Sequence, residues 1–264
     1  MKKYIVIGNP ISHSMSPQIH NYWLKKNNIN GIYEKEKLNN NDLKSFFLSI
    51  RNNVVSGANI TVPFKKEVIS YLDEMSPEAE STQSVNTIYF KNNKIIGHNT
   101  DIDGFKFAIK ETNYEVANKK ILIIGAGGVV PSIIFALIKM KASSVLLCNR
   151  TESKANDMKK MFNHLTIIKW GELPEFDMVI NATSVGLKND QNLNLDFSKV
   201  GKGKFFYDVI YNPKETNFLK IGKKLGCKTE NGKKMFIHQA AQAFNVWHGI
   251  QPEINDEISE LLDK

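Results

Sequence analysis

The sequence predicts an α/β protein of two domains, the second of which is built from parallel βαβ units. Three observations support this prediction. The chain of 264 residues is too long for one small hydrophobic core and short for three domains. Short β-rich apolar runs alternate with amphipathic helical segments along most of its length. Near the middle, a continuous apolar run leads directly into a glycine-rich turn and another helical segment.

The first alternating stretch extends to about residue 103. Tyr4–Gly8 has the pattern of a buried strand, and Pro17–Asn27 that of a helix with proline in the first turn, where no backbone N–H is needed. The other elements expected here are strand Ile32–Lys37, helix Asn41–Arg51, strand Ala58–Val62, a helix starting near Phe64, and strands Thr87–Phe90 and Lys94–Gly97 around an Asn92-Asn93 hairpin turn. Residues 1–103 therefore predict an α/β domain of their own.

The second stretch is a cleaner alternation of strands and helices, which implies right-handed parallel βαβ connections. Its expected elements are helix Gly104–Thr112, strand Ile121–Ile124, the turn Gly125–Gly128, helix Pro131–Met140, and strands Val145–Leu147 and Asp177–Asn181. Met235 to Lys264 is helical again. We expect a second domain at 104–234, helices at 235–264 that return to the first domain, and a cleft between the two domains.

Composition argues against a membrane or secreted protein. The longest apolar runs, such as Val129 to Ile138, are too short to cross a bilayer, and Tyr4–Gly8 is only a strand-length run rather than a signal peptide. Cys148 and Cys227 lack metal-ligand or CxxC spacing and are expected to be buried free thiols. A cytoplasmic protein is therefore expected.

The net charge of +8 raises the question of nucleic-acid binding. The basic residues are nearly all lysines, with arginine only at positions 51 and 150, and they are scattered along the chain without a long basic run. This pattern is typical of a solvated lysine-rich surface rather than of a nucleic-acid interface. The histidines have no carboxylate or cysteine partners at ligand spacing, so no metal site is expected.

The strongest local motif is the apolar strand Ile121–Ile124 followed by Gly125-Ala126-Gly127-Gly128 and a helix. Glycines in this position let backbone N–H groups approach a pyrophosphate, which the helix N-terminus stabilises. The motif predicts a Rossmann dinucleotide site, and an incidental tight turn is the alternative. The third glycine of the usual pattern falls at Val130, whose bulk should push the helix slightly off the strand.

The cofactor is expected to be NADP. NAD enzymes usually carry an acidic residue some 20 positions beyond the glycines, but here the second strand ends in Cys148-Asn149-Arg150-Thr151, and Lys154 follows. A planar guanidinium can bind the 2′-phosphate through two hydrogen bonds. The alternative for Arg150 is a surface arginine at a turn.

Polar residues also follow the strands of the first domain. The loop after Gly8 is rich in hydroxyls, and Asn59 and Thr61 share one face of a strand by period-two alternation. Lys65 is expected in the first turn of a helix, where the dipole opposes a cation, so it needs a carboxylate partner or a functional reason. The segments around Asn86 and Asp101 add further polar groups at strand ends.

Nine motifs together resemble the shikimate dehydrogenase family. They are GNPISHSMSP, GANITVPFK, SVNT, GHNTDIDG, GAGG, NRT, INATSVGL, YDVIYNPKET and NGKKMFIHQAAQAF with a following tryptophan. They occur in the family's order from about residue 5 to residue 249. The resemblance implies NADPH-dependent reduction of 3-dehydroshikimate to shikimate, in an N-terminal substrate domain joined to a C-terminal Rossmann domain.

The resemblance also implies roles for individual residues. Lys65 and Asp101 would be the catalytic pair. The substrate would be bound by Ser14, Ser16 and Tyr211 at its carboxylate and by Asn59, Thr61, Asn86 and Gln239 at its hydroxyls. NADP would be contacted by Gly125, Ala126, Gly127, Gly128, Val129, Asn149, Arg150, Thr151, Lys154, Val209 and Gly232.

Elementary chemistry agrees with the catalytic assignment. A keto group that accepts hydride develops negative charge on oxygen, which the Lys65 ammonium can stabilise and protonate while Asp101 orients it. In the last helix, Ile237, Ala240, Ala241, Phe244 and His248 form one face, and Gln239 and Gln242 lie largely opposite. Only the family pattern selects Gln239 over Gln242.

Two alternatives remain at the level of the sequence. A quinate/shikimate dehydrogenase should prefer an acidic ribose-binding residue, and a regulatory module that senses NADP should have lost Lys65 or Asp101. The expected partner is a small-molecule substrate, and the expected assembly is a monomer or homodimer.

Overall fold

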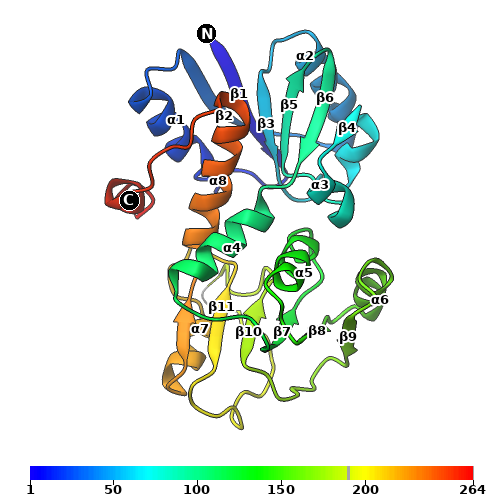
Figure 1. Ribbon diagram of the computed structural model, residues 1–264, viewed down its shortest axis with the longest axis vertical. Helices are drawn as coiled ribbons and strands as arrows, with labels where there is room; N and C mark the ends of the chain where they lie inside the picture. The colour runs from blue at the N-terminus through cyan, green and yellow to red at the C-terminus, as the bar shows by residue number, and fades with distance from the viewer. Residues whose placement is uncertain (189–190, 264) are drawn as a thin grey trace. The chain divides into compact units, whose positions relative to one another are not determined.

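The computed structural model describes residues 1–188 and 191–263 (Figure 1). The chain forms two compact units: unit 1 comprises Met1–Gly104 and Ile237–Lys264, and unit 2 comprises Phe105–Phe236. Helix α4 (Asp101–Glu111) leads from unit 1 into unit 2, and helix α8 (Lys233–His248) leads back. Within the described residues, each unit contains one six-stranded sheet.

The sheet of unit 1 is mixed and has the strand order β2-β1-β3-β5-β6-β4. Its strands are β1 (Lys2–Gly8), β2 (Gly31–Lys37), β3 (Gly57–Ile60), β4 (Glu74–Met75), β5 (Thr87–Lys91) and β6 (Lys94–His98). Strands β1, β2 and β3 are parallel, and β5 runs antiparallel to both β3 and β6. The carboxyl ends of β1, β3 and β6 and the amino end of β5 therefore lie at one edge of the sheet.

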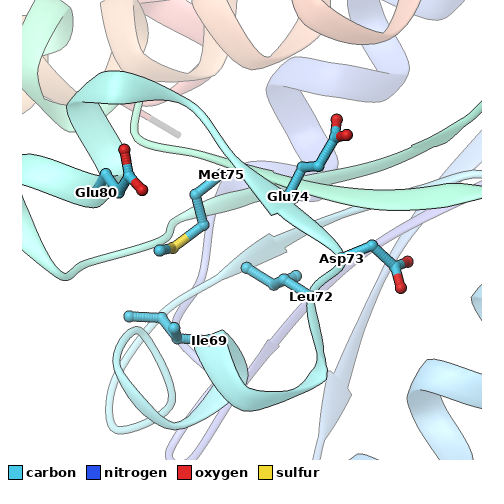
Figure 2. Close-up of a pocket in the computed structure, with 6 residues that line it drawn as sticks. All are labelled: Ile69, Leu72, Asp73, Glu74, Met75 and Glu80. Atoms are coloured by element: carbon cyan, nitrogen blue, oxygen red, sulfur yellow. The ribbon is translucent and has the colours of Figure 1, made fainter.

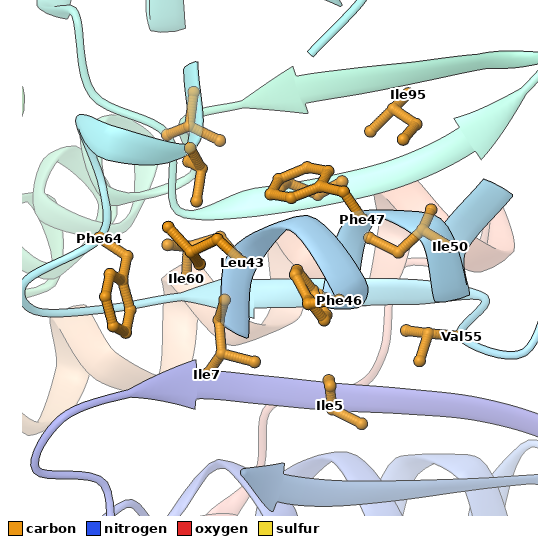
Figure 3. Packing of buried hydrophobic residues seen from close by; sticks show 14 of the residues in the cluster. Ile5, Ile7, Leu43, Phe46, Phe47, Ile50, Val55, Ile60, Phe64 and Ile95 are labelled. Atoms are coloured by element: carbon orange, nitrogen blue, oxygen red, sulfur yellow. The ribbon is translucent and has the colours of Figure 1, made fainter. Parts of the chain in front are cut away.

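The helices of unit 1 cover both faces of this sheet. They are α1 (Ser16–Lys26), the 3₁₀ turn η1 (Asn40–Asp42), α2 (Leu43–Arg51), the 3₁₀ turn η2 (Glu67–Tyr71), α3 (Pro77–Thr82), most of α8, and α9 (Asp256–Leu261). Figure 3 shows α2 packed on β1 and β3, where Phe46 and Phe47 join Ile5, Ile7 and Ile60 in a dry core. Alternation along β1 turns Tyr4 to the opposite face, where its ring lies 5.0 Å from that of Trp247 in α8.

Unit 2 is a parallel sheet with the strand order β12-β11-β10-β7-β8-β9. The strands are β7 (Lys120–Ile124), β8 (Ser144–Cys148), β9 (Leu165–Ile168), β10 (Met178–Asn181), β11 (Phe205–Asp208) and β12 (Lys228–Glu230), with helices α5 (Val130–Lys139), α6 (Glu152–Met161) and α7 (Asn217–Lys224) between them. Counted from β7, this is the order 3-2-1-4-5-6 of a Rossmann fold. The predicted α/β class and the Rossmann unit are confirmed.

The structure corrects two local predictions in unit 1. No α-helix starts near Phe64: residues 62–66 form turns, and the 3₁₀ turn η2 follows. Lys65 therefore lies in a turn, and the helix-dipole argument does not apply to it. The helix expected from Gly104 starts at Asp101 instead, which places this carboxylate in the first turn of α4, where the dipole favours a negative charge.

Most other expected elements are confirmed within one to three residues. The Asn92-Asn93 turn has φ of 52° and 62°, the left-handed values that a tight two-residue hairpin requires. Elements β4, α3, α6, β9, β11, α7 and β12 were not predicted. Helix α6 illustrates the reason, because Ala155 is its only buried residue and no apolar stripe marks it in the sequence.

Candidate active site

Polar side chains from three segments gather at the edge of the unit 1 sheet where β1, β3 and β6 end and β5 begins. Lys65 follows β3, Asn86 immediately precedes β5, and Asp101 follows β6. Because these strand ends share one edge, residues far apart in the sequence become neighbours. The convergence is a consequence of the sheet topology rather than of any single motif.

The shortest contact in this group is the ion pair between Lys65 Nζ and Asp101 Oδ2, at 2.5 Å. The two side chains are only 12 % and 8 % exposed. Asn86 Nδ2 donates to the other carboxylate oxygen, Asp101 Oδ1, at 2.9 Å. The carboxylate is thus fixed through both oxygens, and one of the three N–H donors of Lys65 is committed to it. A fixed ammonium of this kind is suited to stabilising charge on a nearby oxygen.

A buried hydrogen-bond network extends from this pair and includes two residues that the sequence analysis did not select. The Asn86 Oδ1 atom accepts from Thr100 N at 2.8 Å and from Thr87 Oγ1 at 3.0 Å. Thr87 Oγ1 in turn accepts from Asn59 Nδ2 at 3.1 Å. Thr87 and Thr100 belong to the SVNT and GHNTDIDG motifs. Their position next to Asn86 and Asp101 in the sequence could have identified them as members of the site.

The remaining predicted substrate residues of unit 1, Ser14, Ser16 and Thr61, follow strands β1 and β3, which end at the same edge of the sheet. Ser14 Oγ accepts from Ser16 N at 3.3 Å, which orders the hydroxyl-rich loop at the start of α1. The segments that follow β1 and β3 lie close together, and Thr61 N donates to Ile7 O at 3.0 Å. A Cβ atom at Gly8 would lie only 2.5 Å from the Thr61 methyl group, so this close approach requires glycine at position 8.

Helix α8 contributes Gln239. Its Oε1 atom lies 3.5 Å from Asn86 Nδ2, whereas Gln242 Nε2 lies 3.5 Å from Gln251 Oε1. The predicted apolar face of this helix is confirmed for Ile237, Ala240, Ala241 and Phe244, which are buried, whereas His248 is only partly buried. Tyr211, the other predicted substrate residue, belongs to unit 2, where its ring stacks on Phe236 at 4.6 Å.

The glycine turn of unit 2 follows β7, next to the point where the strand order reverses. Gly125 has φ of +112°, and a Cβ there would lie 2.8 Å from Ala182 O, so only glycine fits. A Cβ atom at Gly127 would have Ala182 O, at 3.8 Å, as its nearest neighbour, so the backbone of Gly127 is accessible to a ligand. Gly128 and Val129 complete the turn before α5, and the turn fits a bound pyrophosphate. Val130, at the third-glycine position, is fully buried.

The candidate ribose-phosphate residues follow β8 at the same edge of the sheet. Arg150 and Lys154 are exposed, and Asn149 Nδ2 donates to Thr151 O at 2.7 Å, which shapes the turn into α6. Arg150 stands where NAD enzymes usually carry an acidic residue, and its guanidinium matches a phosphate rather than a free ribose hydroxyl. Glu152 follows in the first turn of α6.

Val209 and Gly232 also meet in unit 2. Gly232 N donates to Ile210 O at 3.0 Å, and a Cβ on Gly232 would lie 2.1 Å from Val209 O. The preceding residue, Asp208, is buried and accepts from Thr216 Oγ1 at 2.6 Å and Ile210 N at 3.0 Å. Burial raises the pKa of Asp208 to about 6 although these hydrogen bonds oppose the change.

Two cavities of the described residues are lined by none of these residues. Figure 2 shows one of about 400 Å³ in unit 1, lined by Ile69, Leu72, Asp73, Glu74, Met75 and Glu80. Asp73 is paired with Arg51 and Glu74 with Lys94, so the acidic rim is partly neutralised. Among residues 1–188 and 191–263, no three His, Cys, Asp or Glu residues cluster as a metal site would require. No helix in the same ranges has the length and apolarity to cross a membrane.

The two cysteines are free thiols. Cys148 is fully buried at the end of β8, and burial raises its pKa to about 11. Cys227 is only partly buried, which differs from the expectation for this residue.

Comparisons with known proteins match this geometry. The family profile described as shikimate dehydrogenase substrate binding domain matches residues 6–88, and the profile described as shikimate / quinate 5-dehydrogenase matches residues 106–209. A shikimate dehydrogenase (NADP(+)) of Pelagibacter ubique (strain HTCC1062) is 57 % identical over 262 residues, which cover 99 % of each chain.

Two solved structures show the same similarity. The shikimate dehydrogenase of Aquifex aeolicus has a TM-score of 0.91 and 34 % identity, with 100 % of this chain and 98 % of that chain covered. The shikimate 5-dehydrogenase of Thermus thermophilus, in complex with NADP(H) and shikimate, has a TM-score of 0.91 and 30 % identity. The match covers 100 % of this chain and 99 % of that chain.

Proposed function

The chain belongs to the shikimate dehydrogenase family, and from that premise we propose that it catalyses the NADPH-dependent, reversible reduction of 3-dehydroshikimate to shikimate in aromatic amino-acid (chorismate) biosynthesis. The observation that supports this most directly is the Lys65–Asp101 pair, held by Asn86 at the polar edge of the unit 1 sheet. A regulatory module without catalysis would have no need for this pair.

The two units divide the work in this proposal. Unit 1 binds the substrate: Ser14 and Ser16 bind its carboxylate, and Asn59, Thr61, Asn86 and Gln239 bind its hydroxyls. Tyr211 of unit 2 adds a carboxylate contact. The open glycine turn Gly125–Val129 and the cationic end of β8 support NADP binding by unit 2, with Asn149, Arg150, Thr151, Lys154, Val209 and Gly232 as further contacts.

The chain's own residues supply the acid–base chemistry. NADPH, when bound, is the hydride donor. As the carbonyl carbon of the substrate is reduced, its oxygen gains negative charge, and Lys65 stabilises that charge and delivers a proton to the oxygen. Asp101 holds the Lys65 ammonium and, after proton transfer, stays beside the neutral amine as the partner that favours its reprotonation. Oxidation of shikimate runs through the same groups in reverse.

The decisive test is a matrix of initial rates for shikimate and quinate, each with NADP and with NAD. We expect the highest kcat/KM for shikimate with NADP, because Arg150 follows β8 at the position where NAD enzymes usually carry an acidic residue. A preference for quinate with NAD would support the alternative quinate/shikimate dehydrogenase. The absence of turnover with all four pairs would contradict the proposal.

We also place this enzyme in the cytoplasm, as a monomer or homodimer. The supporting observations are its two free thiols and the biosynthetic role proposed above. Sedimentation of the purified protein at micromolar concentration distinguishes the two assembly states.

A further inference from the structure

Tyr33 in β2 is a buried tyrosine whose hydroxyl points at a residue of the candidate substrate site. It is 2 % exposed, and its Oη donates to Asn59 Oδ1 at 2.7 Å. The Ser16 side chain also hydrogen-bonds to Tyr33. One phenol thus connects the carboxylate-binding loop at the start of α1 with the amide at the end of β3.

The contacts of Asn59 leave its amide only one orientation. Asn59 Nδ2 donates to Asn86 O at 3.1 Å and to Thr87 Oγ1 at 3.1 Å. Asn86 O is a carbonyl and accepts only, so Nδ2 must face it and Oδ1 must face Tyr33. Both N–H groups of the amide are then in use, and the remaining capacity of Asn59 is a lone pair on Oδ1. A ligand at Asn59 must therefore be a hydrogen-bond donor, such as a hydroxyl.

The Tyr33 ring is held firmly enough to impose this orientation. His20 stacks on it with ring centroids 4.3 Å apart and an angle of 4°, and Trp247 lies 6.1 Å away on α8. The amide that Tyr33 fixes is in turn linked through Thr87 to Asn86, and Asn86 binds Asp101. The network therefore runs without interruption from Ser16 to the catalytic pair.

We propose that Tyr33 is a positioning residue of the substrate site: its hydroxyl fixes Asn59 as a hydrogen-bond acceptor for a ring hydroxyl of the substrate and ties that acceptor to Ser16. This inference rests on the function proposed above. Tyr33 does not touch the reacting atoms, so it affects how tightly and how selectively the substrate is held rather than the proton transfer at Lys65.

The test is Tyr33→Phe, which removes one oxygen and keeps the ring that packs on His20. We expect KM for shikimate to rise about 10-fold, with kcat within about twofold of the wild type and an unchanged Kd for NADP, because one neutral hydrogen bond that orders Asn59 is lost. Tyr4→Phe is the matched control, since Tyr4 is equally buried and also lies beside Trp247, whereas it is the Tyr33 hydroxyl that donates to Asn59 Oδ1. It should leave KM unchanged.

A double-mutant cycle with Asn59→Ala separates positioning from general packing. In the Asn59→Ala background, Tyr33→Phe should raise KM no further. An unchanged KM for Tyr33→Phe, an equal rise in both backgrounds, or a loss of kcat at constant KM would overturn the inference. If the wild-type chain itself fails to oxidise shikimate, the proposed function fails; if it turns over and Tyr33→Phe behaves like it, only the role of Tyr33 fails.

Discussion

At the scale of single residues, Lys65 and Asp101 lie 36 positions apart in the sequence and 2.5 Å apart in the fold. A nearly buried ion pair of this kind is costly to desolvate and adds little net stability. Asn86 offsets part of that cost by binding the second carboxylate oxygen. The pair is therefore better explained by chemistry on a ligand than by stabilisation of unit 1.

Replacing this lysine should affect turnover far more than binding. We expect Lys65→Ala to lower kcat by about 10²–10⁴-fold, the usual contribution of a positioned acid–base group. Asp101→Asn should lower kcat as well, and the double variant should be far from additive because the two act as a unit. Lys66→Ala, at the exposed neighbouring position, is the control. Steady-state kinetics that give a near-normal kcat for Lys65→Ala would rule out the mechanism.

Arg150 offers a second test at this scale, because the chain has only one other arginine. Arg150→Ala should weaken NADP binding by about 1.5–3 kcal/mol, as expected for a lost charged hydrogen bond, and should change NAD binding much less. Arg51→Ala is the matched control, since Arg51 is paired with Asp73 in unit 1. Isothermal titration with both cofactors measures the effect, and equal losses for NADP and NAD would refute the 2′-phosphate role.

At the scale of elements, Thr216 combines two functions at the start of α7. Its Oγ1 atom accepts from Leu219 N at 3.3 Å as an N-cap and donates to the buried Asp208 Oδ2 at 2.6 Å. Asp208 in turn accepts from Asn181 Nδ2 at 3.1 Å, so the cap joins β10, β11 and α7 at the edge that carries Val209. Ser76 caps α3 through Ala79 N alone.

Removing the two caps should therefore have unequal costs. We expect Thr216→Ala to lower the free energy of unfolding of unit 2 by about 2–4 kcal/mol, because it removes a cap and a hydrogen bond to a buried carboxylate. Ser76→Ala should cost unit 1 about 0.5–2 kcal/mol. Thr216→Ser should recover most of the loss. Native-state hydrogen exchange measures the free energy of unfolding of each unit separately. A smaller loss of that free energy for Thr216→Ala than for Ser76→Ala would be inconsistent with this account.

At the scale of the whole molecule, acid should destabilise unit 1 before unit 2. Burial lowers the pKa of His20 to about 3, and the neighbouring His248 contributes to this effect. Burial also lowers the pKa of His248 to about 4, and the charge of Lys2 adds to this effect. Neither ring nitrogen of His20 has a hydrogen-bond partner in the described part of the chain. In unit 2, burial raises the pKa of Asp208 to about 6, which has the opposite consequence.

The sign follows from linkage. A histidine with a lowered folded pKa contributes stability that is complete above pH 6.5 and is lost as the pH falls towards 3, because only the unfolded chain then binds the proton. For His20, the contribution to the free energy of unfolding above pH 6.5 exceeds that below pH 3 by about 5 kcal/mol. Asp208, by contrast, favours the folded state below about pH 4 and loses that contribution as the pH rises through 6.

The corresponding experiment is urea unfolding of unit 1 at pH 4.5 and pH 7.5, followed by Trp23 and Trp247 fluorescence against a Trp170→Phe background. His20→Phe keeps an aromatic ring beside Tyr33 and Trp23 and should flatten the dependence on pH. His164→Gln, at an exposed position of unit 2, should leave it unchanged. An equally steep dependence in His20→Phe would remove His20 as its cause.

The sequence by itself determined the local features of this protein. Continuous apolar runs marked β1 and β7, the glycines marked the turn after β7, and the residues after β8 marked a phosphate rather than a ribose hydroxyl as the expected ligand. Each of these features depends on residues within one element and its flanking turn, which a sequence pattern records directly. The α-helix predicted to start near Phe64 was wrong, because the chain forms turns and a 3₁₀ segment there.

Only the tertiary structure decided which distant side chains meet. The order of the strands brings the ends of β1, β3 and β6 together. Helix α8 places Gln239 rather than Gln242 beside Asn86, and Tyr33 in β2 donates a hydrogen bond to Asn59. No local pattern distinguishes Tyr33 from other buried tyrosines, because its role depends on the register of β2 against β1 and on the neighbours that this register provides. The physical reason is that long-range pairing is selected by the packing of whole elements, whereas a sequence pattern reports only the preferences of residues within a few positions of one another.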